Sequence, residues 1–134
     1  MGGQARSPNF LTVNPQGQVP AVVLPDGRML AQSNTIISYL AAYTPLVPQD
    51  RYLRAKVDEF LFWERYSQES YVAVCRFQML YLGKTPAQRD EWRVTRGEAA
   101  LDYLEGELTH RQWLAGTGIT TADIALLAYT RMAA

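Results

Sequence analysis

Few side chains in this sequence could carry out catalysis or bind a metal by themselves. The 134-residue chain contains one cysteine, Cys75, and one histidine, His110. A lone thiol excludes an internal disulfide framework and a cysteine-based metal cluster. With a single imidazole as well, a protein metal site would have to consist of carboxylates alone. We therefore expect no metal, and we expect Cys75 to be a buried thiol rather than a nucleophile.

The strongest local signal is a threonine followed three residues later by an aspartate. Residues 119–124 read Ile-Thr-Thr-Ala-Asp-Ile, so Thr120 can cap a helix while the Asp123 carboxylate accepts from the Thr120 amide. A carboxylate in the first turn also suits the helix dipole. No base, nucleophile or metal ligand lies beside Asp123 in the sequence. A structural capping box formed by Thr120 and Asp123 is therefore favoured over a catalytic role.

A β-hairpin is expected in the first third of the chain. Residues 21–24 form a β-prone run, Pro25-Asp26-Gly27-Arg28 has turn chemistry, and residues 29–31 resume the apolar pattern. Two strands alone are marginally stable in water, so this hairpin needs a surface to pack against.

The rest of the sequence has helical periodicity. Ser33 can cap a helix that ends before Thr44-Pro45, because a residue preceding proline avoids the helical region. Thr85-Pro86-Ala87-Gln88 combines three helix-start signals. Residues 44–49 contain two prolines and resemble an interdomain linker. The sequence therefore predicts one domain at 1–45 and a second at 46–134. We expect helices at residues 33–43, 50–82, 86–108 and 121–133, with the second burying Val57, Phe60, Leu61, Tyr71, Val72, Cys75, Met79 and Leu82.

Composition excludes several classes of protein. The 13 basic and 13 acidic residues give zero net charge, so no basic surface for nucleic acid is expected. No apolar run approaches the roughly 18 residues of a membrane span, and the first residues lack the apolar stretch of a secretory signal. We expect a cytoplasmic protein that binds neither nucleic acid nor membrane.

Four segments of the sequence, in order, carry motifs of one known family. Residues 14–20 read Asn-Pro-Gln-Gly-Gln-Val-Pro, which resembles the Asn-Pro-x-Gly-x-Val-Pro segment of the glutathione S-transferase family. Residues 26–33 resemble its hairpin and the following acidic-or-Gln/Ser pair, and residues 36–40 resemble the helix after that pair. Trp-Leu-Ala-Gly at 113–116, followed by Thr120 and Asp123, resembles the element Trp-Leu-x-Gly … Thr-x-x-Asp.

The resemblance implies a mostly α fold. A partial thioredoxin-like hairpin and helix would be followed by an all-α glutathione-transferase C-terminal helical domain. It implies a cis Val19–Pro20 peptide whose backbone pairs with the cysteinyl part of glutathione, while Gln32 and Ser33 hold the γ-glutamyl part. Gln18 lies where family members often carry a polar residue near the glycyl carboxylate. Taken alone, Val19–Pro20 is also compatible with a strand boundary and Ser33 with a helix cap.

The resemblance also implies partners. Glutathione would be the co-substrate, a small electrophile the acceptor, and the full-length form a homodimer. Tyr66, Tyr71, Arg76 and Tyr129 could face an acceptor pocket between the domains; packing positions for the tyrosines and a surface position for Arg76 are the alternatives.

The chain departs from the family pattern before Asn14. Family members begin with a strand, a helix and a second strand, and the loop after the first strand carries the Tyr, Ser or Cys that stabilises the thiolate. A strand-helix-strand unit takes about 30 residues or more. We therefore expect the catalytic residue to be missing, its identity unknown, and the 134 residues alone to have little or no transferase activity. Helices that usually follow the last motif are also expected to be missing.

Two functions of different classes remain. The first is a glutathione S-transferase that conjugates electrophiles with glutathione, or reduces them, in detoxification. The second is a non-catalytic binding or assembly module with the same fold, because fold does not decide function.

Overall fold

The computed structural model describes residues 3–133. The chain divides between Tyr43 and Thr44 into two compact units, which we call the N-unit and the C-unit. The predicted boundary lies between residues 45 and 46, and the assignment of these parts as domains stays a prediction.

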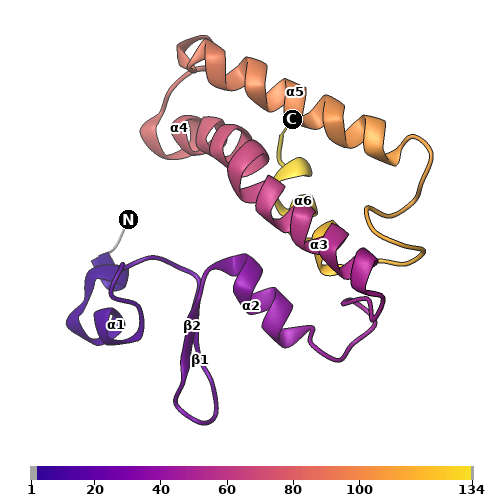
Figure 1. Ribbon diagram of the computed structural model, residues 1–134. Coiled ribbons are helices and arrows are strands. Elements are labelled where there is room, and N and C mark those ends of the chain that lie inside the picture. Colours follow the sequence, from indigo (N-terminus) through magenta and orange to yellow (C-terminus); the bar gives the residue numbers. More distant parts are fainter. Residues whose placement is uncertain (1–2, 134) are drawn as a thin grey trace. The chain divides into compact units, whose positions relative to one another are not determined.

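The N-unit contains a hairpin with a helix on either side in the sequence (Figure 1). Its elements are η1 (Gly3–Arg6), α1 (Pro8–Val13), β1 (Ala21–Val23), β2 (Met29–Ala31) and α2 (Ser33–Leu40). We did not predict α1. Ser7 caps it by accepting a 3.3 Å hydrogen bond from the Phe10 amide, and Pro8 occupies the first turn, where its missing N–H costs nothing.

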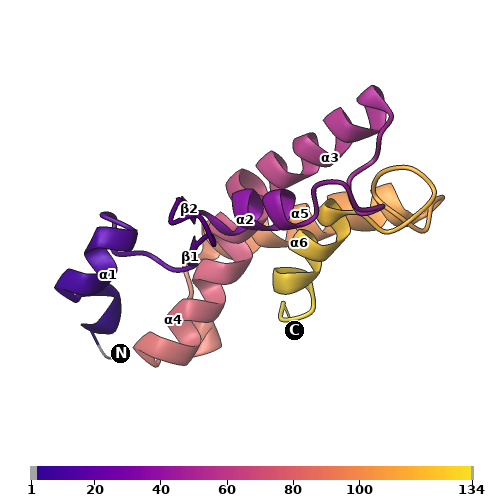
Figure 2. The ribbon, with the colours of Figure 1, turned by 90° about the horizontal axis from the view of Figure 1, so that it is seen from below.

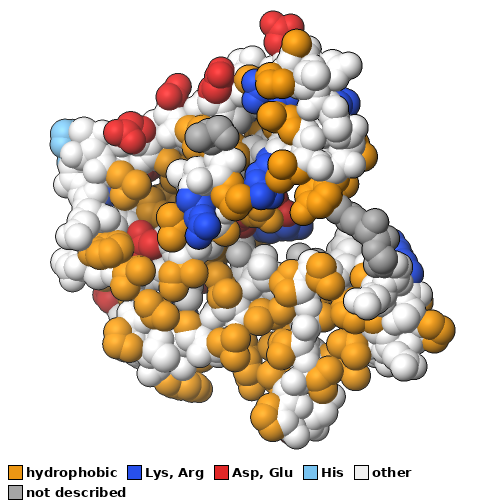
Figure 3. All heavy atoms as spheres, turned by 180° about the vertical axis from the view of Figure 1, so that it is seen from behind, with side chains coloured by type: hydrophobic (Ala, Val, Ile, Leu, Met, Phe, Trp, Pro, Cys, Tyr) orange, Lys and Arg blue, Asp and Glu red, His pale blue; other side chains and the backbone are white. Residues whose placement is uncertain are grey.

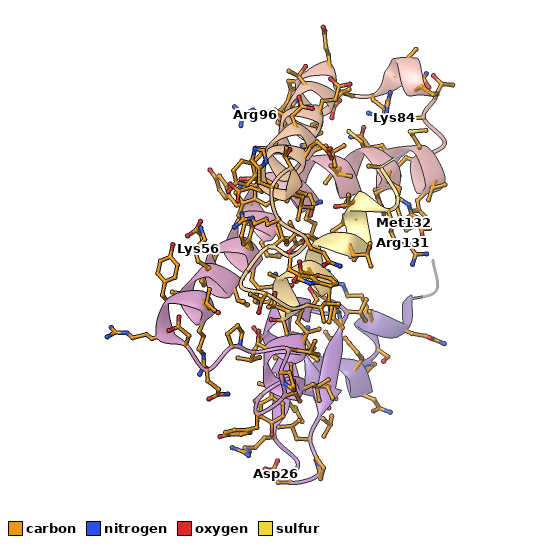
Figure 4. The ribbon with its side chains drawn as sticks, turned by 90° about the vertical axis from the view of Figure 1, so that its right-hand side faces the viewer. Asp26, Lys56, Lys84, Arg96, Arg131 and Met132 are labelled. Carbon is orange, nitrogen blue, oxygen red and sulfur yellow. The ribbon has the colours of Figure 1, made fainter. Side chains whose placement is uncertain are left out.

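The predicted hairpin is confirmed. Strands β1 and β2 are antiparallel, with Ala21 opposite Ala31. Asp26 lies at the tip (Figure 4), where its Oδ1 accepts from the Arg28 amide at 3.0 Å and its Oδ2 lies 2.7 Å from the Arg28 guanidinium. These hydrogen bonds from Arg28 hold the pKa of the Asp26 carboxyl below its usual value. Gly27 has a φ of 83°, a conformation that glycine adopts without strain.

Helix α2 differs from its prediction at both ends. It stops at Leu40 rather than residue 43, with Ala41 as the C-cap. Gln32, not Ser33, occupies the N-cap position, with φ 71° and ψ 122° and no side-chain capping bond. The prediction of Ser33 as the cap is therefore wrong, because the turn out of β2 is made at Gln32 and Ser33 is already the first helical residue.

The C-unit is helical. A continuous rod runs through α3 (Arg51–Trp63), the ten-residue π-helical segment η2 (Glu64–Ala73) and α4 (Val74–Leu82), as Figure 2 shows. The turn η3 (Pro86–Gln88) precedes α5 (Glu91–Leu108), and α6 (Thr121–Thr130) follows a long loop. Helices α5 and α6 both pack against η2.

The π-helical segment corrects the predicted core. We expected one α-helix over residues 50–82, whereas its middle is η2, which buries the polar side chains of Glu64 and Gln68. The Gln68 Nε2 donates to the Thr130 hydroxyl at 2.6 Å and so ties η2 to α6. Met79 and Leu82, which we expected in the core, are exposed. The buried apolar side chains of this unit are Val57, Phe60, Leu61, Val72, Cys75, Ala100, Leu104, Leu114, Ala115, Ala122, Ala125 and Leu126.

Helix α5 begins later than predicted. The capping box of Thr85 and Gln88 is present, but it encloses η3, and the chain then turns again before Glu91. Asp90 precedes α5 and accepts 3.0 Å hydrogen bonds from Gln78 of α4 and from Arg93. The start of α5 is therefore fixed by contacts with α4 as well as by local signals.

Asp123 stabilises the start of α6 through hydrogen bonds. Both reciprocal contacts of a capping box are present: the Thr120 side chain accepts from the Asp123 amide, and the Thr120 amide donates to the Asp123 Oδ2 at 2.8 Å. The Thr120 hydroxyl also donates to the Asp123 Oδ2 at 2.8 Å. The other carboxylate oxygen accepts from the Leu114 amide at 2.9 Å. One side chain thus holds the helix start and the loop before it. Overall, the structure is mostly α with one small antiparallel sheet, as predicted.

Candidate functional site

A short loop before the hairpin is held by a buried asparagine. Asn14 is 5% exposed, and its Nδ2 donates to the Gln18 carbonyl at 2.7 Å while its Oδ1 accepts from the Gln16 amide at 3.2 Å. Gly17 has a φ of 63°, and a Cβ there would lie 2.9 Å from the Arg6 guanidinium. The loop therefore requires glycine at 17, and Asn14 fixes the chain that leads to Val19.

The hairpin brings two of the predicted motifs to the same end. Because Ala21 is opposite Ala31, the residues that continue the strands are Pro20 on one side and Gln32 on the other. Val19 and Ser33 follow them. The Val19–Pro20 peptide is cis, which confirms that prediction. Val19–Pro20 and Gln32–Ser33 thus lie at the same end of the hairpin, although they are at least twelve residues apart in the sequence.

Polar groups at this end of the hairpin are accessible and unpaired. The Val19 side chain is 72% exposed, and within residues 3–133 neither its amide nor its carbonyl has a hydrogen-bond partner. The side chains of Gln32 and Ser33 are also exposed and, in the same range, form no hydrogen bond. The positive φ of Gln32 is an uncommon conformation for a residue with a side chain, and such conformations gather at ligand sites. We call Val19, Gln32 and Ser33 the hairpin-end site.

Gln18 contributes differently from these three residues. Its carbonyl is occupied by Asn14, whereas its side chain is exposed and has no partner among the described residues. The amide side chain of Gln18 is therefore available to a ligand, and the predicted role near a carboxylate stays a prediction.

A concave surface lies within the C-unit. It is a cleft of about 450 Å³ between the rod and the end of α6. Of the four residues that we named for an acceptor pocket, Arg76 and Tyr129 line it. Tyr71 instead accepts a 3.0 Å hydrogen bond from Arg96 of α5, and Tyr66 is 79% exposed. The cleft is lined by Arg65, Glu69, Ser70, Ala73, Val74, Arg76, Phe77, Tyr81 and Tyr129.

Only some of the charged side chains in the cleft are paired. Arg65 forms an ion pair with Glu69 one helical turn away. Burial, together with the negative charges of Glu69 and Glu64, raises the pKa of the Tyr129 phenol above its usual value. The phenol therefore keeps its proton at neutral pH. Arg76 is half-buried, and its guanidinium forms no ion pair or hydrogen bond within the described part of the chain.

Two family models together cover residues 2–134. Residues 2–42 match the model described as "Glutathione S-transferase, N-terminal domain". Residues 41–134 match the model described as "Glutathione S-transferase, C-terminal domain". The chain belongs to the glutathione S-transferase family.

Known relatives agree with this family assignment. The chain is 33% identical over 132 residues to glutathione S-transferase GstA of Escherichia coli O157:H7, covering 93% of this chain and 62% of the relative. It is 30% identical over 125 residues to elongation factor 1-gamma of Drosophila melanogaster, covering 93% of this chain and 28% of the relative. A solved glutathione S-transferase from Xanthobacter autotrophicus Py2 aligns with a TM-score of 0.87 and 45% identity, over 96% of this chain and 64% of the other.

The match spans only part of each relative. This chain covers 62% of the length of the Escherichia coli protein and 64% of the Xanthobacter protein. Glutathione is the co-substrate of the family, and the fold of this member is the thioredoxin-like and helical fold of its relatives.

Between residues 3 and 133 no three His, Cys, Asp or Glu side chains form a group that could hold a metal ion. In the same range, no helix is both long and apolar enough to cross a membrane. Cys75 is a free, buried thiol, as predicted.

Two residues that organise these sites were not predicted from the sequence. Asn14 lies inside the family-like motif, but we assigned it no role, and only the structure places its side chain on the Gln18 carbonyl. Glu69 was also overlooked, because its contacts join η2 to α6 across the C-unit, and a helical sequence gives no local signal for them.

Proposed function

We propose that this chain contains the part of a glutathione transferase that binds the backbone of glutathione, and that the enzyme transfers glutathione to small electrophiles or reduces them with it. One observation carries the proposal. The unpaired backbone of Val19 lies at the same end of the hairpin as the unpaired, exposed side chains of Gln32 and Ser33.

Each part of glutathione has a complementary group in this arrangement. The cysteinyl residue pairs its amide and carbonyl with those of Val19, as an added strand does. The γ-glutamyl carboxylate accepts from the Ser33 hydroxyl and from the amide at the start of α2, where the helix dipole favours an anion. Gln32 donates its amide to the same γ-glutamyl group, and Gln18 lies near the glycyl carboxylate.

The transfer itself requires the glutathione thiolate. The thiol loses its proton, the sulfur forms a bond to the electrophilic carbon, and the leaving group departs with the bonding electron pair. A free thiol has a pKa of about 8.5, so a group that stabilises the thiolate is needed near neutral pH. We assign no residue to this role. Low transferase activity of the 134 residues alone stays a prediction, as do the homodimer, the cytoplasmic location and the role in detoxification.

Titration calorimetry with glutathione tests the binding proposal. We expect Ser33→Ala to raise the dissociation constant about tenfold or more, because a hydrogen bond to a charged group is worth about 1.5–3 kcal/mol. Ser38→Ala is the matched control, since Ser38 is on the same helix and forms no side-chain hydrogen bond among the described residues. An equal affinity of parent and Ser33→Ala for glutathione would contradict the proposal.

A second candidate function is a non-catalytic binding or assembly module. The similarity to elongation factor 1-gamma of Drosophila melanogaster favours it, because that protein is not named as a transferase. The same titration distinguishes the two functions. A folded chain that takes up no glutathione at millimolar concentration supports the module, whereas binding that depends on Ser33 supports the transferase.

A further inference from the structure

The cleft of the C-unit combines aromatic walls with an unpaired cation. Phe77 and Tyr81 come from α4, and Tyr129 comes from α6. The rings of Phe77 and Tyr81 are 5.2 Å apart and tilted by 37°, so they form a continuous aromatic surface. A volume of about 450 Å³ falls within the range of small-molecule sites.

The charges of the cleft leave one positive group uncompensated. Arg65 and Glu69 neutralise each other through their ion pair. Glu69 also lies close enough to Tyr129 for its negative charge, in addition to burial, to raise the pKa of the phenol. Arg76, in contrast, meets no carboxylate and no hydrogen-bond acceptor within residues 3–133, although it is half-buried. An arginine that is partly removed from water and unpaired is favourable once an anion provides its partner.

We propose that this cleft binds an aromatic compound that carries a carboxylate, with the carboxylate on Arg76 and the ring against Phe77, Tyr81 and Tyr129. Arginine presents a planar fork of donors that matches a carboxylate in two parallel hydrogen bonds. The aromatic side chains bury the ring of the compound, and the protonated Tyr129 adds no negative charge that would repel it. As an identification of the acceptor substrate, this inference rests on the proposed transferase function; as a statement about binding to the cleft, it does not.

The alternative ligand of this cleft is a neutral aromatic compound. Such a compound would fill the same aromatic surface, but it would leave the Arg76 guanidinium without a partner. The charge of Arg76 should therefore give the cleft different affinities for 2-naphthoate and 2-naphthamide, two ligands of the same shape that differ in charge.

Binding of these two probes to the whole chain, measured by nuclear magnetic resonance without glutathione, tests the inference. We expect 2-naphthoate to bind about tenfold more tightly than 2-naphthamide, because the Arg76 guanidinium forms stronger hydrogen bonds with a carboxylate than with a neutral amide. A tenfold difference in affinity corresponds to about 1.4 kcal/mol. The amide signals of Phe77 and Tyr129 should shift with both probes. In Arg76→Gln the preference for 2-naphthoate should disappear, whereas Arg76→Lys should retain most of it.

Arg54→Gln is the matched control, because Arg54 is an exposed arginine of α3 outside the cleft and its side chain has no partner among the described residues. It should leave both affinities unchanged. Equal affinities of the parent for the two probes, or a preference that survives Arg76→Gln, would overturn the inference. If Arg76→Gln does not fold, the salt dependence of the parent decides, since added salt should weaken 2-naphthoate alone.

The result is independent of the test of glutathione binding. A chain that binds glutathione through Ser33 but shows no preference for 2-naphthoate retains the proposed function and loses this inference. A chain that prefers 2-naphthoate but does not bind glutathione retains the anion cleft and loses the proposed function.

Discussion

The two units differ in which side chains they bury and which they expose. In the N-unit, only Asn14, Leu24 and Ala41 are buried among the residues described, and the polar groups of Val19, Gln32 and Ser33 are exposed and unpaired. In the C-unit, a dozen apolar side chains are buried along the rod, α5, α6 and the loop between α5 and α6. Figure 3 shows that hydrophobic side chains also lie on the surface of the molecule, in places beside basic ones.

The groups that are available for recognition and the groups that stabilise the fold thus lie mostly in different units. Hydrophobic burial is the main stabilising term in folding, and most of the fully buried side chains are in the C-unit. Unpaired polar groups add nothing to stability but are available to a ligand. We infer that the C-unit carries most of the folding free energy and that the hairpin-end site of the N-unit carries the recognition of glutathione.

The largest effect is expected in the core of the C-unit. Phe60 is 1% exposed, so Phe60→Ala should lower the free energy of unfolding by about 3–5 kcal/mol through lost burial and the cavity left behind. All three tryptophans, Trp63, Trp92 and Trp113, are in the C-unit, and their fluorescence during urea denaturation follows its unfolding.

Leu24→Ala in the N-unit should affect the C-unit much less. Leu24 is 8% exposed and follows β1, so its loss should destabilise the hairpin. The tryptophan signal should shift much less than in Phe60→Ala. A shift of equal size in the two variants would contradict the division of stability between the units.

A smaller loss is expected at the capping box. Asp123→Ala removes the acceptor for the Thr120 amide and hydroxyl and for the Leu114 amide, and Thr120 is 2% exposed. The free energy of unfolding should fall by about 2 kcal/mol, in the range of lost caps and unsatisfied buried donors.

Asp102→Ala is the control for this change, because Asp102 is exposed on α5 and has no partner among the described residues. Its unfolding should match the parent. If Asp123→Ala unfolds like the parent but binds glutathione less well, the structural role of Asp123 is wrong.

Local signals predicted local structure well. The hairpin was predicted from its β-prone runs and turn residues and the buried Cys75 from helical periodicity, and both are present. The cis Val19–Pro20 peptide, also present, was implied by the family resemblance rather than by the local residues alone. The helix of residues 8–13 was missed although Ser7 and Pro8 are ordinary start signals, because so short an element has little apolar periodicity.

Contacts between distant segments were harder to predict. The π-helical segment η2 widens the rod, and it buries Glu64 and Gln68, which a search for an apolar face passes over. For the same reason, the sequence did not predict that Arg76 and Tyr129 line the cleft whereas Tyr71 accepts a hydrogen bond from Arg96. Which face of a helix meets its neighbour is decided by packing, and the periodicity of one helix alone does not determine it.

The most direct test of the proposed division is a glutathione titration of the isotopically labelled chain, followed amide by amide. We predict that the signals of Val19, Gln32 and Ser33 shift together with a single dissociation constant, because their groups form one site at the end of the hairpin. The signals of Phe60 and Ala122 in the C-unit core should stay in place. Shifts confined to the C-unit, or no shift at Val19 in a chain that binds glutathione, would contradict the assignment of glutathione recognition to the N-unit.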